Sequence, residues 1–194
     1  MKKGCMSGND VNELVRRAQA GEAQAFETLM RTYDRQILHL AYQMLDNTMD
    51  AEDVTQEVFM RAYRRLSDFR FESEFFTWLY RIAVNCAISA RRRRLRNRHA
   101  SIDRSDTAAD SFERRLKDSG HEPDKQMIQQ EIRETVEKHL DKLPIMQRVV
   151  FFLRFMEDFK IREIAEITGS SEGAVKNSLF RSTRKMRKHL AHLI

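Results

Sequence analysis

The sequence predicts an all-α protein with two small helical domains joined by a flexible linker. Apolar residues recur at a spacing of three to four over most of the 194 residues, and the chain has only 2 Pro and 6 Gly. This spacing lapses at 99–124, where charged residues and Ser replace most large apolar side chains. We therefore expect an N-terminal helical bundle at 10–98, a linker at 99–124 and a C-terminal four-helix domain at 125–194.

The N-terminal bundle is expected to contain four helices. Two of them lie within 10–45 and are separated at Gly21; a third opens at Asp50, with Asp53 in a capping position; a fourth spans 75–96 after a loop at 67–74. Their predicted core-facing residues are Val11, Leu14, Val15, Ala18, Phe26, Leu29, Met30, Tyr33, Ile37, Leu40, Ala41, Met44, Val54, Val58, Ala62, Leu66, Trp78, Leu79, Ile82, Ala83, Cys86 and Ala87.

The C-terminal domain is expected to end in a helix-turn-helix. Helices are predicted after Pro123 and after Pro144, and a further pair at 161–168 and 174–190 is separated by the turn at 169–171. Gly169 supplies the sharp turn, and Ser170 or Ser171 can cap the last helix. Apolar residues that would pack the pair together are Ile164, Ala165, Ile167, Val175 and Leu179.

Two tracts without acidic residues carry the positive charge. The six arginines within 91–98 form one tract, and the six Lys and Arg residues from Lys176 onward form the other. Each tract carries +6 and the whole chain also carries +6, so the remaining residues carry −6. This distribution indicates two docking sites for a polyanion rather than general adhesion.

The last helix has the composition of a helix that enters the DNA major groove. Lys176, Asn177, Phe180 and Arg181 occupy its first turns, where such helices meet base edges. Arg184 and Lys185 follow, at positions suited to phosphates. The plainer alternative is a solvated amphipathic helix in a helical bundle.

The arginine tract and the preceding aromatic residues suggest a second nucleic-acid surface. Consecutive arginines point around a helix and form a collar that can neutralise phosphates; the alternative is compensation of the helix dipole. Of the nearby aromatic residues, we assign Phe76 and Trp78 to the core and expect the loop residues from Phe69 to Phe75 to stack on single-stranded bases.

The segment between Gln36 and Met60 has no Lys or Arg and contains Asp46, Asp50, Glu52, Asp53 and Glu57. Such a patch favours a protein partner with basic residues, since DNA would be repelled. An acidic first turn stabilised by the helix dipole accounts for part of the same charge.

Other function classes find little support. The sequence has no P-loop, dinucleotide turn or nucleophile elbow, so we predict no enzyme, no catalytic residues and no cofactor. Cys5 and Cys86 match no metal spacing, and His189 and His192 have no nearby carboxylate or thiol, so we predict no metal. No apolar run approaches the roughly 18 residues of a membrane span, and the N-terminus does not read as a signal peptide. We therefore expect a cytoplasmic protein that does not insert into membranes.

Three stretches resemble the bacterial extracytoplasmic-function sigma factors of the sigma-70 family, and especially their RpoE-like branch. DAEDVTQEVFMRAYRRLSDF and FFTWLYRIAVNCAISARRRR are similar to the second region of that family, with WLYRIAVN the most specific part. LPIMQRVVFFLRFMEDFKIREIAEITGSSEGAVKNSLFRSTRKMRKHL is similar to the fourth region. LuxR-type regulators share a fourth-region helix-turn-helix, so the order of both regions around a linker carries the resemblance.

The resemblance implies a dissociable subunit of bacterial RNA polymerase that directs it to promoters, for a stress or envelope-response regulon. It implies contacts with the clamp helices and the flap of core polymerase, a linker directed toward the RNA-exit path, and an anti-sigma factor, often membrane-anchored. The implied polymerase-binding residues are Asp50, Glu52, Asp53, Gln56 and Glu57. The implied −10 residues are Arg70, Phe71, Phe75, Arg81, Asn85, Arg91 and Arg92, with one base flipped out of the stack. The implied −35 residues are Lys176, Asn177, Phe180, Arg181, Arg184 and Lys185.

One loop and two single positions depart from the family pattern. Arg70-Phe71-Glu72-Ser73 stands where this branch often has Arg-Gly-Asp-Ser, Ser89 stands where relatives can carry Asn, and Ser178 stands where Arg is common. The remaining alternative function is a one-component DNA-binding regulator whose N-terminal bundle senses a signal or dimerises.

Overall fold

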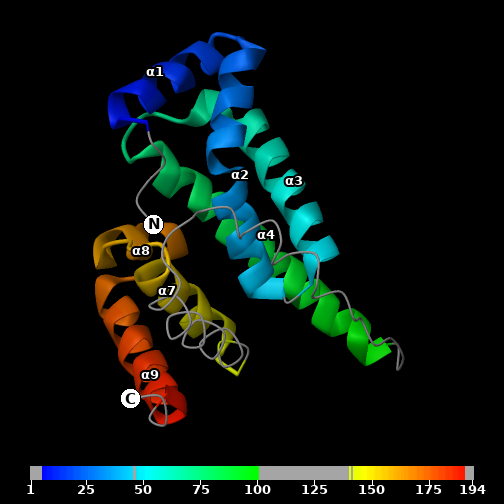
Figure 1. Ribbon diagram of the computed structural model, residues 1–194, viewed down its shortest axis with the longest axis vertical. Helices are drawn as coiled ribbons and strands as arrows, with labels where there is room; N and C mark the ends of the chain where they lie inside the picture. Colours follow the sequence, from blue (N-terminus) through cyan, green and yellow to red (C-terminus); the bar gives the residue numbers. More distant parts are fainter. Residues whose placement is uncertain (1–5, 46, 101–139, 141, 191–194) are drawn as a thin grey trace, which may run out of the picture. The chain divides into compact units, whose positions relative to one another are not determined.

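The computed structural model describes residues 6–45, 47–100, 140 and 142–190, and within these residues it contains helices and no strand. The chain divides into two compact units. One contains helices α1 to α4, and the other contains α7, α9 and most of α8 (Figure 1). The all-helical prediction is confirmed, whereas the predicted linker and the predicted helix after Pro123, apart from Leu140, lie outside the described residues.

The N-terminal unit is built from α1 (Gly8–Gln19), α2 (Ala23–Leu45), α3 (Thr48–Arg65), the short 3₁₀ helix η1 (Leu66–Asp68) and α4 (Phe75–Ala100). Helices α2, α3 and α4 pack against one another, and α1 packs on α2 near η1 (Figure 1). Gly21, with φ of +93°, makes the turn between α1 and α2. The predicted break at this residue is therefore confirmed.

The core of this unit follows the predicted helical faces. Val15, Ile37, Leu40 and Val58 have no exposed surface, and each such burial contributes about 1.5–3 kcal/mol relative to an exposed side chain. Of the predicted core residues, only Met30 and Trp78 are half-buried rather than buried. Helical periodicity therefore predicted the interior of the unit almost residue by residue.

The start of α3 differs from the prediction. The helix begins at Thr48, and Asn47 is its N-cap, with the Asn47 side chain accepting a hydrogen bond from the Asp50 backbone N–H at 2.9 Å. Asp50 therefore lies in the first turn rather than opening the helix. Asn and Asp cap helices about equally well, and here the earlier residue of the two takes the position.

The C-terminal unit contains α7 (Ile145–Phe155), α8 (Ile161–Thr168) and α9 (Glu172–Leu190). Helix α7 packs against α9, and Leu140, Leu143, Phe151 and Met186 form a buried cluster. Helices α8 and α9 are the predicted helix-turn-helix, and α9 begins two residues earlier than expected. The helix predicted after Pro123, which would be the first of this domain, lies outside the described residues apart from Leu140.

Candidate functional site

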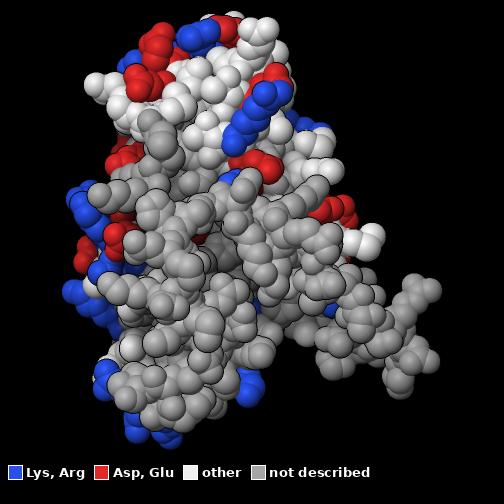
Figure 2. Space-filling view, in the orientation of Figure 1, with Lys and Arg blue, Asp and Glu red and all other residues white. Residues whose placement is uncertain are grey.

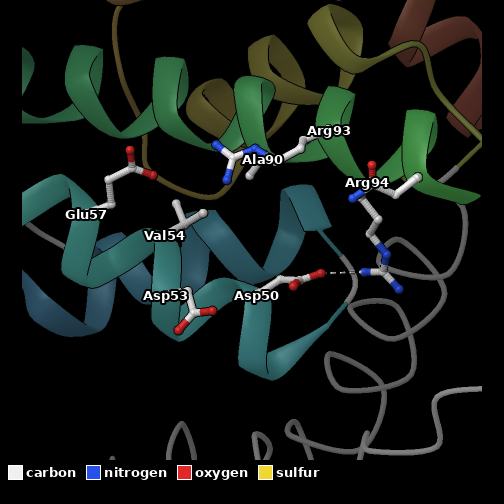
Figure 3. Close-up of a pocket in the computed structure, with 8 residues that line it drawn as sticks. Asp50, Asp53, Val54, Glu57, Ala90, Arg93 and Arg94 are labelled. Atoms are coloured by element: carbon white, nitrogen blue, oxygen red, sulfur yellow. Dashed lines mark hydrogen bonds and ion pairs between the residues drawn. The ribbon is translucent and has the colours of Figure 1, made fainter.

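The arginine tract on α4 is divided between two tasks. The last carbonyls of a helix have no partner within that helix. Arg91 donates to the Met44 carbonyl at 2.6 Å and Arg94 to the Leu45 carbonyl at 2.7 Å, so both arginines satisfy the end of α2. Arg94 also donates to the Asp50 carboxylate at 3.1 Å (Figure 3). These two side chains join α2, α3 and α4.

The tract is therefore not a uniform collar. Arg92, Arg93 and Arg96 are exposed, whereas Arg91 and Arg94 are half-buried. Arg91 is half-buried and donates one bond to backbone of the same domain, and its contact with a phosphate stays a prediction. Arg92 remains available at the surface. A helix-dipole argument did not anticipate this either, since the carbonyls belong to another helix.

Helix α4 exposes a polar stripe that starts soon after the loop. Arg81, Asn85, Ser89 and Arg92 are all exposed and follow one another at spacings of four, four and three residues. Such spacing places them on one face of the helix. The structure thus brings three predicted residues, Arg81, Asn85 and Arg92, into one line. Ser89, one of the departures from the family pattern, lies within that line.

The loop from Phe69 to Glu74 is held mostly by aromatic packing. Phe69 is 5% exposed and Phe75 is 3% exposed. The Phe69 ring lies 4.9 Å from Phe71, 5.7 Å from Phe75 and 5.3 Å from Trp78, centroid to centroid. We correct the expectation that Phe69 and Phe75 stack on bases, because their rings belong to the core. Arg70 is exposed and Phe71 is half-buried.

Tyr33 supports the base of this loop from α2. Its ring lies 5.8 Å from Phe75 and 5.3 Å from Phe76. Burial, and then the charge of Glu74, raise the pKa of Tyr33 to about 12, so the ring stays neutral at physiological pH. The start of α4 is therefore anchored by a neutral aromatic layer.

Phe71 adopts a backbone conformation that is rare for its residue type. Its φ is +60°, in the left-handed region that favours glycine. The Arg16 guanidinium lies over the Phe71 ring at 5.1 Å from the centroid. Gln19, on the same helix, donates to the Leu66 carbonyl at 2.8 Å and to the Phe69 carbonyl at 2.9 Å. Sequence reasoning missed both α1 residues, because the contacts span about fifty residues of chain.

Helices α3 and α4 enclose a cavity of about 290 Å³ that is lined partly by acidic residues. Asp50, Asp53 and Glu57 line it from α3, and Arg93, Arg94 and Asn97 line it from α4 (Figure 3). Asp50 is paired with Arg94, and Glu57 is paired with Arg61 at 2.5 Å. Two of the five predicted polymerase-binding residues therefore make ion pairs within the domain.

The outer face of α3 carries both polar and apolar residues. Asp53 and Gln56 are exposed, and so are Met49 at 73%, Met60 at 55% and Tyr63 at 58%. All five follow spacings of three or four residues, which place them on one face. The sequence analysis assigns no binding role to Met49, Met60 or Tyr63. Their signal was a second apolar stripe, offset from the core stripe of Val54, Val58 and Ala62.

The helix-turn-helix has the expected turn. Gly169 has φ of +64°, and the Ser171 hydroxyl accepts a hydrogen bond from the Ala174 backbone N–H at 3.2 Å. Of the two predicted capping residues, Ser171 thus makes the capping bond. Val175, Ser182 and Met186 are buried on the inner face of α9. This packing fixes which side of α9 faces outward.

The outward side of α9 contains every predicted reading residue. Lys176, Asn177, Phe180, Arg181, Arg184 and Lys185 are all exposed. Phe180 is 66% exposed, which is unusual for a large aromatic side chain. Figure 2 shows basic side chains along the edge where α9 runs in Figure 1. The surface suits a polyanion with an apolar feature at its centre.

Other kinds of site find no support within the described residues. The described part of the chain contains no group of three or more His, Cys, Asp or Glu residues that could bind a metal ion. None of the helices that the structure describes has both the length and the apolarity needed to cross a membrane. Burial raises the pKa of the Cys86 thiol, which favours an unreactive core residue.

The chain is similar to known proteins over most of its length. Residues 29–97 match the family model of Sigma-70 region 2, and residues 133–186 match that of Sigma-70 region 4. The RNA polymerase sigma-H factor of Pseudomonas aeruginosa is 35% identical over 185 residues, 94% of each chain. The ECF sigma factor SigW of Bacillus subtilis is 30% identical over 183 residues, covering 94% of this chain and 98% of SigW. The ECF sigma-E factor of Escherichia coli is 34% identical over 186 residues, covering 93% and 94%.

Solved structures show the same fold. CnrH, in complex with the cytosolic domain of CnrY, superposes with a TM-score of 0.68 at 23% identity and covers 94% of this chain and 98% of CnrH. RpoE of Bartonella quintana, in complex with the anti-sigma factor NepR, superposes with a TM-score of 0.68 at 20% identity. The match covers 87% of this chain and 98% of RpoE. The fold and the two regions define a sigma-70-type initiation factor, which is not an enzyme. This chain belongs to the ECF RNA polymerase sigma factors.

Proposed function

We propose that this chain binds bacterial core RNA polymerase and directs it to promoters through two separate DNA surfaces, one for the −10 element and one for the −35 element. The proposal rests on the presence of two exposed helix faces, one in each unit. They are the polar stripe of α4 and the outer face of α9. Each is backed by a buried face, so each can read DNA without unfolding. A stress or envelope-response regulon fits the relatives named above.

The −35 element would be read by α9 in the major groove. Lys176, Asn177 and Arg181 lie on its first exposed turns and carry donors for base edges. Phe180 offers an apolar surface for a thymine methyl group. Arg184 and Lys185 lie further along the helix and would contact phosphates, which position the helix without reading sequence.

The −10 element would be read by the loop that precedes α4 and by the α4 stripe. Arg70 is exposed in the loop, and Phe71 presents part of its ring. Arg81 and Asn85 would hold a base flipped out of the stack, because both can hydrogen-bond to base edges exposed by flipping. Arg92, at the far end of the stripe, would contact a phosphate. Arg91, which is half-buried, would add a second phosphate contact beside it. Phe75 is left out of this set because it is buried.

Core polymerase would bind the outer face of α3. Asp53 and Gln56 supply polar contacts, and the exposed Met49, Met60 and Tyr63 supply apolar surface. Interfaces of this kind combine an apolar centre with a polar rim. Asp50, Glu52 and Glu57 would contribute charge from the side of this face. The clamp helices of the polymerase are the expected partner here, and the flap is the expected partner of the C-terminal unit.

Regulation would follow the pattern of the relatives. The solved structures of CnrH and RpoE contain CnrY and NepR, and the latter is named an anti-sigma factor. We propose that an anti-sigma protein, which can be membrane-anchored, holds this chain inactive in the cytoplasm. The chain would bind polymerase once that partner releases it.

Run-off transcription with purified bacterial core polymerase tests the proposal. The templates are a promoter library with randomised −35 and −10 elements and matched templates in which either element is scrambled. We expect core polymerase to start at promoter-specific positions only when this protein is added, and only on templates with both elements intact. DNA binding without polymerase-dependent initiation would instead support a one-component regulator.

A further inference from the structure

Helix α1 holds the loop at 69–74 from outside, and neither the sequence motifs nor the family match assigns it a role in DNA reading. Gln19 binds both ends of the segment that leads into the loop, through the carbonyls of Leu66 and Phe69. One amide group with two donors thus fixes two carbonyls three residues apart. The bonds are 2.8 and 2.9 Å long, within the normal range for such bonds.

The second contact from α1 acts on the loop residue with the least favourable backbone. Phe71 has φ of +60°, a conformation in which a bulky side chain is strained. Its ring lies 4.9 Å from the Phe69 ring and 5.1 Å from the Arg16 guanidinium. A strained residue keeps such a conformation only when its surroundings hold it. Arg16 and Phe69 are part of those surroundings.

Helix α1 is itself a firm support. Ser7 and Asp10 form a reciprocal capping box at its N-terminus. Its inner face, with Val15 fully buried, packs on α2. Arg16 and Gln19 are three residues apart and therefore lie on one side of the helix. The same side thus contacts the loop at two points.

We propose that Arg16 and Gln19 are positioning residues that hold the 69–74 loop in one conformation, and that α1 thereby determines how strictly the loop discriminates between −10 bases. This inference rests on the proposed function of the loop. A loop that is held in one conformation before binding cannot adjust to a wrong base, so the unfavourable contacts lower the affinity for that base. A loop that can rearrange relieves those contacts and discriminates less. Neither residue needs to touch DNA.

Initiation rates on four promoters that differ only in the flipped −10 base test the inference. The proteins are wild type, Gln19→Ala, Gln19→Glu, Arg16→Ala and Arg16→Lys, each combined with core polymerase. Each Gln19 variant loses two hydrogen bonds. We therefore expect Gln19→Ala and Gln19→Glu to reduce the ratio between the best and worst base by at least about fivefold, the typical net worth of one hydrogen bond expressed as a ratio. Glu keeps the size of Gln but lacks both donors. Arg16→Lys keeps a cation near the ring and should retain more discrimination than Arg16→Ala.

The matched control is Arg17→Ala. It removes the same charge from the same helix, but the Arg17 side chain pairs with Glu22 and not with the loop. Its base ratio should equal that of wild type, as should the −35 preference of every variant. Because a loss of stability lowers all four rates alike, the ratio separates positioning from a merely structural role.

A double-substitution cycle gives an independent test. In a Phe71→Gly background the strained residue and its ring are gone, so adding Arg16→Ala should no longer change the base ratio. Equal ratios in wild type and both Gln19 variants, or an unchanged Arg16→Ala effect in the Phe71→Gly background, would overturn the inference. If wild type itself shows no preference among the four bases, the proposed function of the loop is wrong instead.

Discussion

The two basic tracts look alike in the sequence and differ in the structure. Each carries +6 without an acidic residue. On α4, Arg91 and Arg94 bind the C-terminal carbonyls of α2, and only part of the tract faces solvent. On α9, all six basic residues of the tract are exposed. Charge density therefore indicates a contact with polar or anionic groups, but those groups can belong to the same chain.

The difference arises from what each helix packs against. The end of α2 lies beside α4 and presents carbonyls that need donors. Helix α9 has Val175, Ser182 and Met186 on its inner face, so its basic residues are left outside. An arginine next to the end of another helix thus indicates a packing contact within the fold. An arginine on the outer face of a helix-turn-helix indicates a contact with DNA.

The largest expected effect separates the structural arginines from the exposed ones. Arg94→Ala should lower the free energy of unfolding of the N-terminal unit by about 1.5–3 kcal/mol, the usual contribution of a hydrogen bond that involves a charged group. Urea unfolding followed by circular dichroism measures this. Arg93→Ala, one residue earlier and exposed, is the control and should change stability by less than about 0.5 kcal/mol. Equal losses in the two variants would remove the distinction drawn here within the α4 tract.

The next effect concerns recognition by α9 without a change in stability. Lys176→Ala and Arg181→Ala should each cost about 1–3 kcal/mol in binding to the preferred −35 element, because base-edge contacts carry that much discrimination. Footprinting of the holoenzyme on matched and altered −35 elements measures it. Lys185→Ala is the control: as a phosphate contact it should weaken binding equally on all elements. An unchanged −35 preference in Arg181→Ala would refute the reading role.

The smallest effect tests whether the exposed part of the α4 tract behaves as the α9 tract does. Arg92→Ala should leave the unfolding midpoint unchanged and reduce the salt dependence of promoter binding by about one unit in slope, since one phosphate contact is lost. Affinity of the holoenzyme measured at several salt concentrations gives the slope. A lower unfolding midpoint with an unchanged slope would show that Arg92, like Arg91, serves the fold.

Much of the fold followed from local pattern. The core faces of α1 to α4 and the bounds of α8 were predicted because helical periodicity depends only on nearby residues. Gly169 was predicted as the turn because a positive φ there costs glycine little. The start of α3 was missed by two residues because Asn47 and Asp50 are both able to cap a helix.

The candidate sites followed less completely. The residues on α9 were predicted because their inward or outward direction is set by the phase of one helix. Phe69 was misassigned because a loop has no periodicity from which burial can be inferred. Phe75 was misassigned because it was grouped with that loop, although it is the first residue of α4. Met49, Met60 and Tyr63 were overlooked because exposed apolar residues are common on ordinary surfaces. The bonds of Gln19 to Leu66 and Phe69 could not be foreseen from sequence spacing.

The sequence by itself determined the helices, their buried faces and the family, because these depend on residues a few positions apart or on motifs read in order. Tertiary structure alone decided the partners of Arg91 and Arg94, the burial of Phe75, the contact of Arg16 with Phe71 and the bonds of Gln19 to Leu66 and Phe69. Each of these contacts joins residues about 40 to 55 positions apart, and such contacts form only when separate helices pack together.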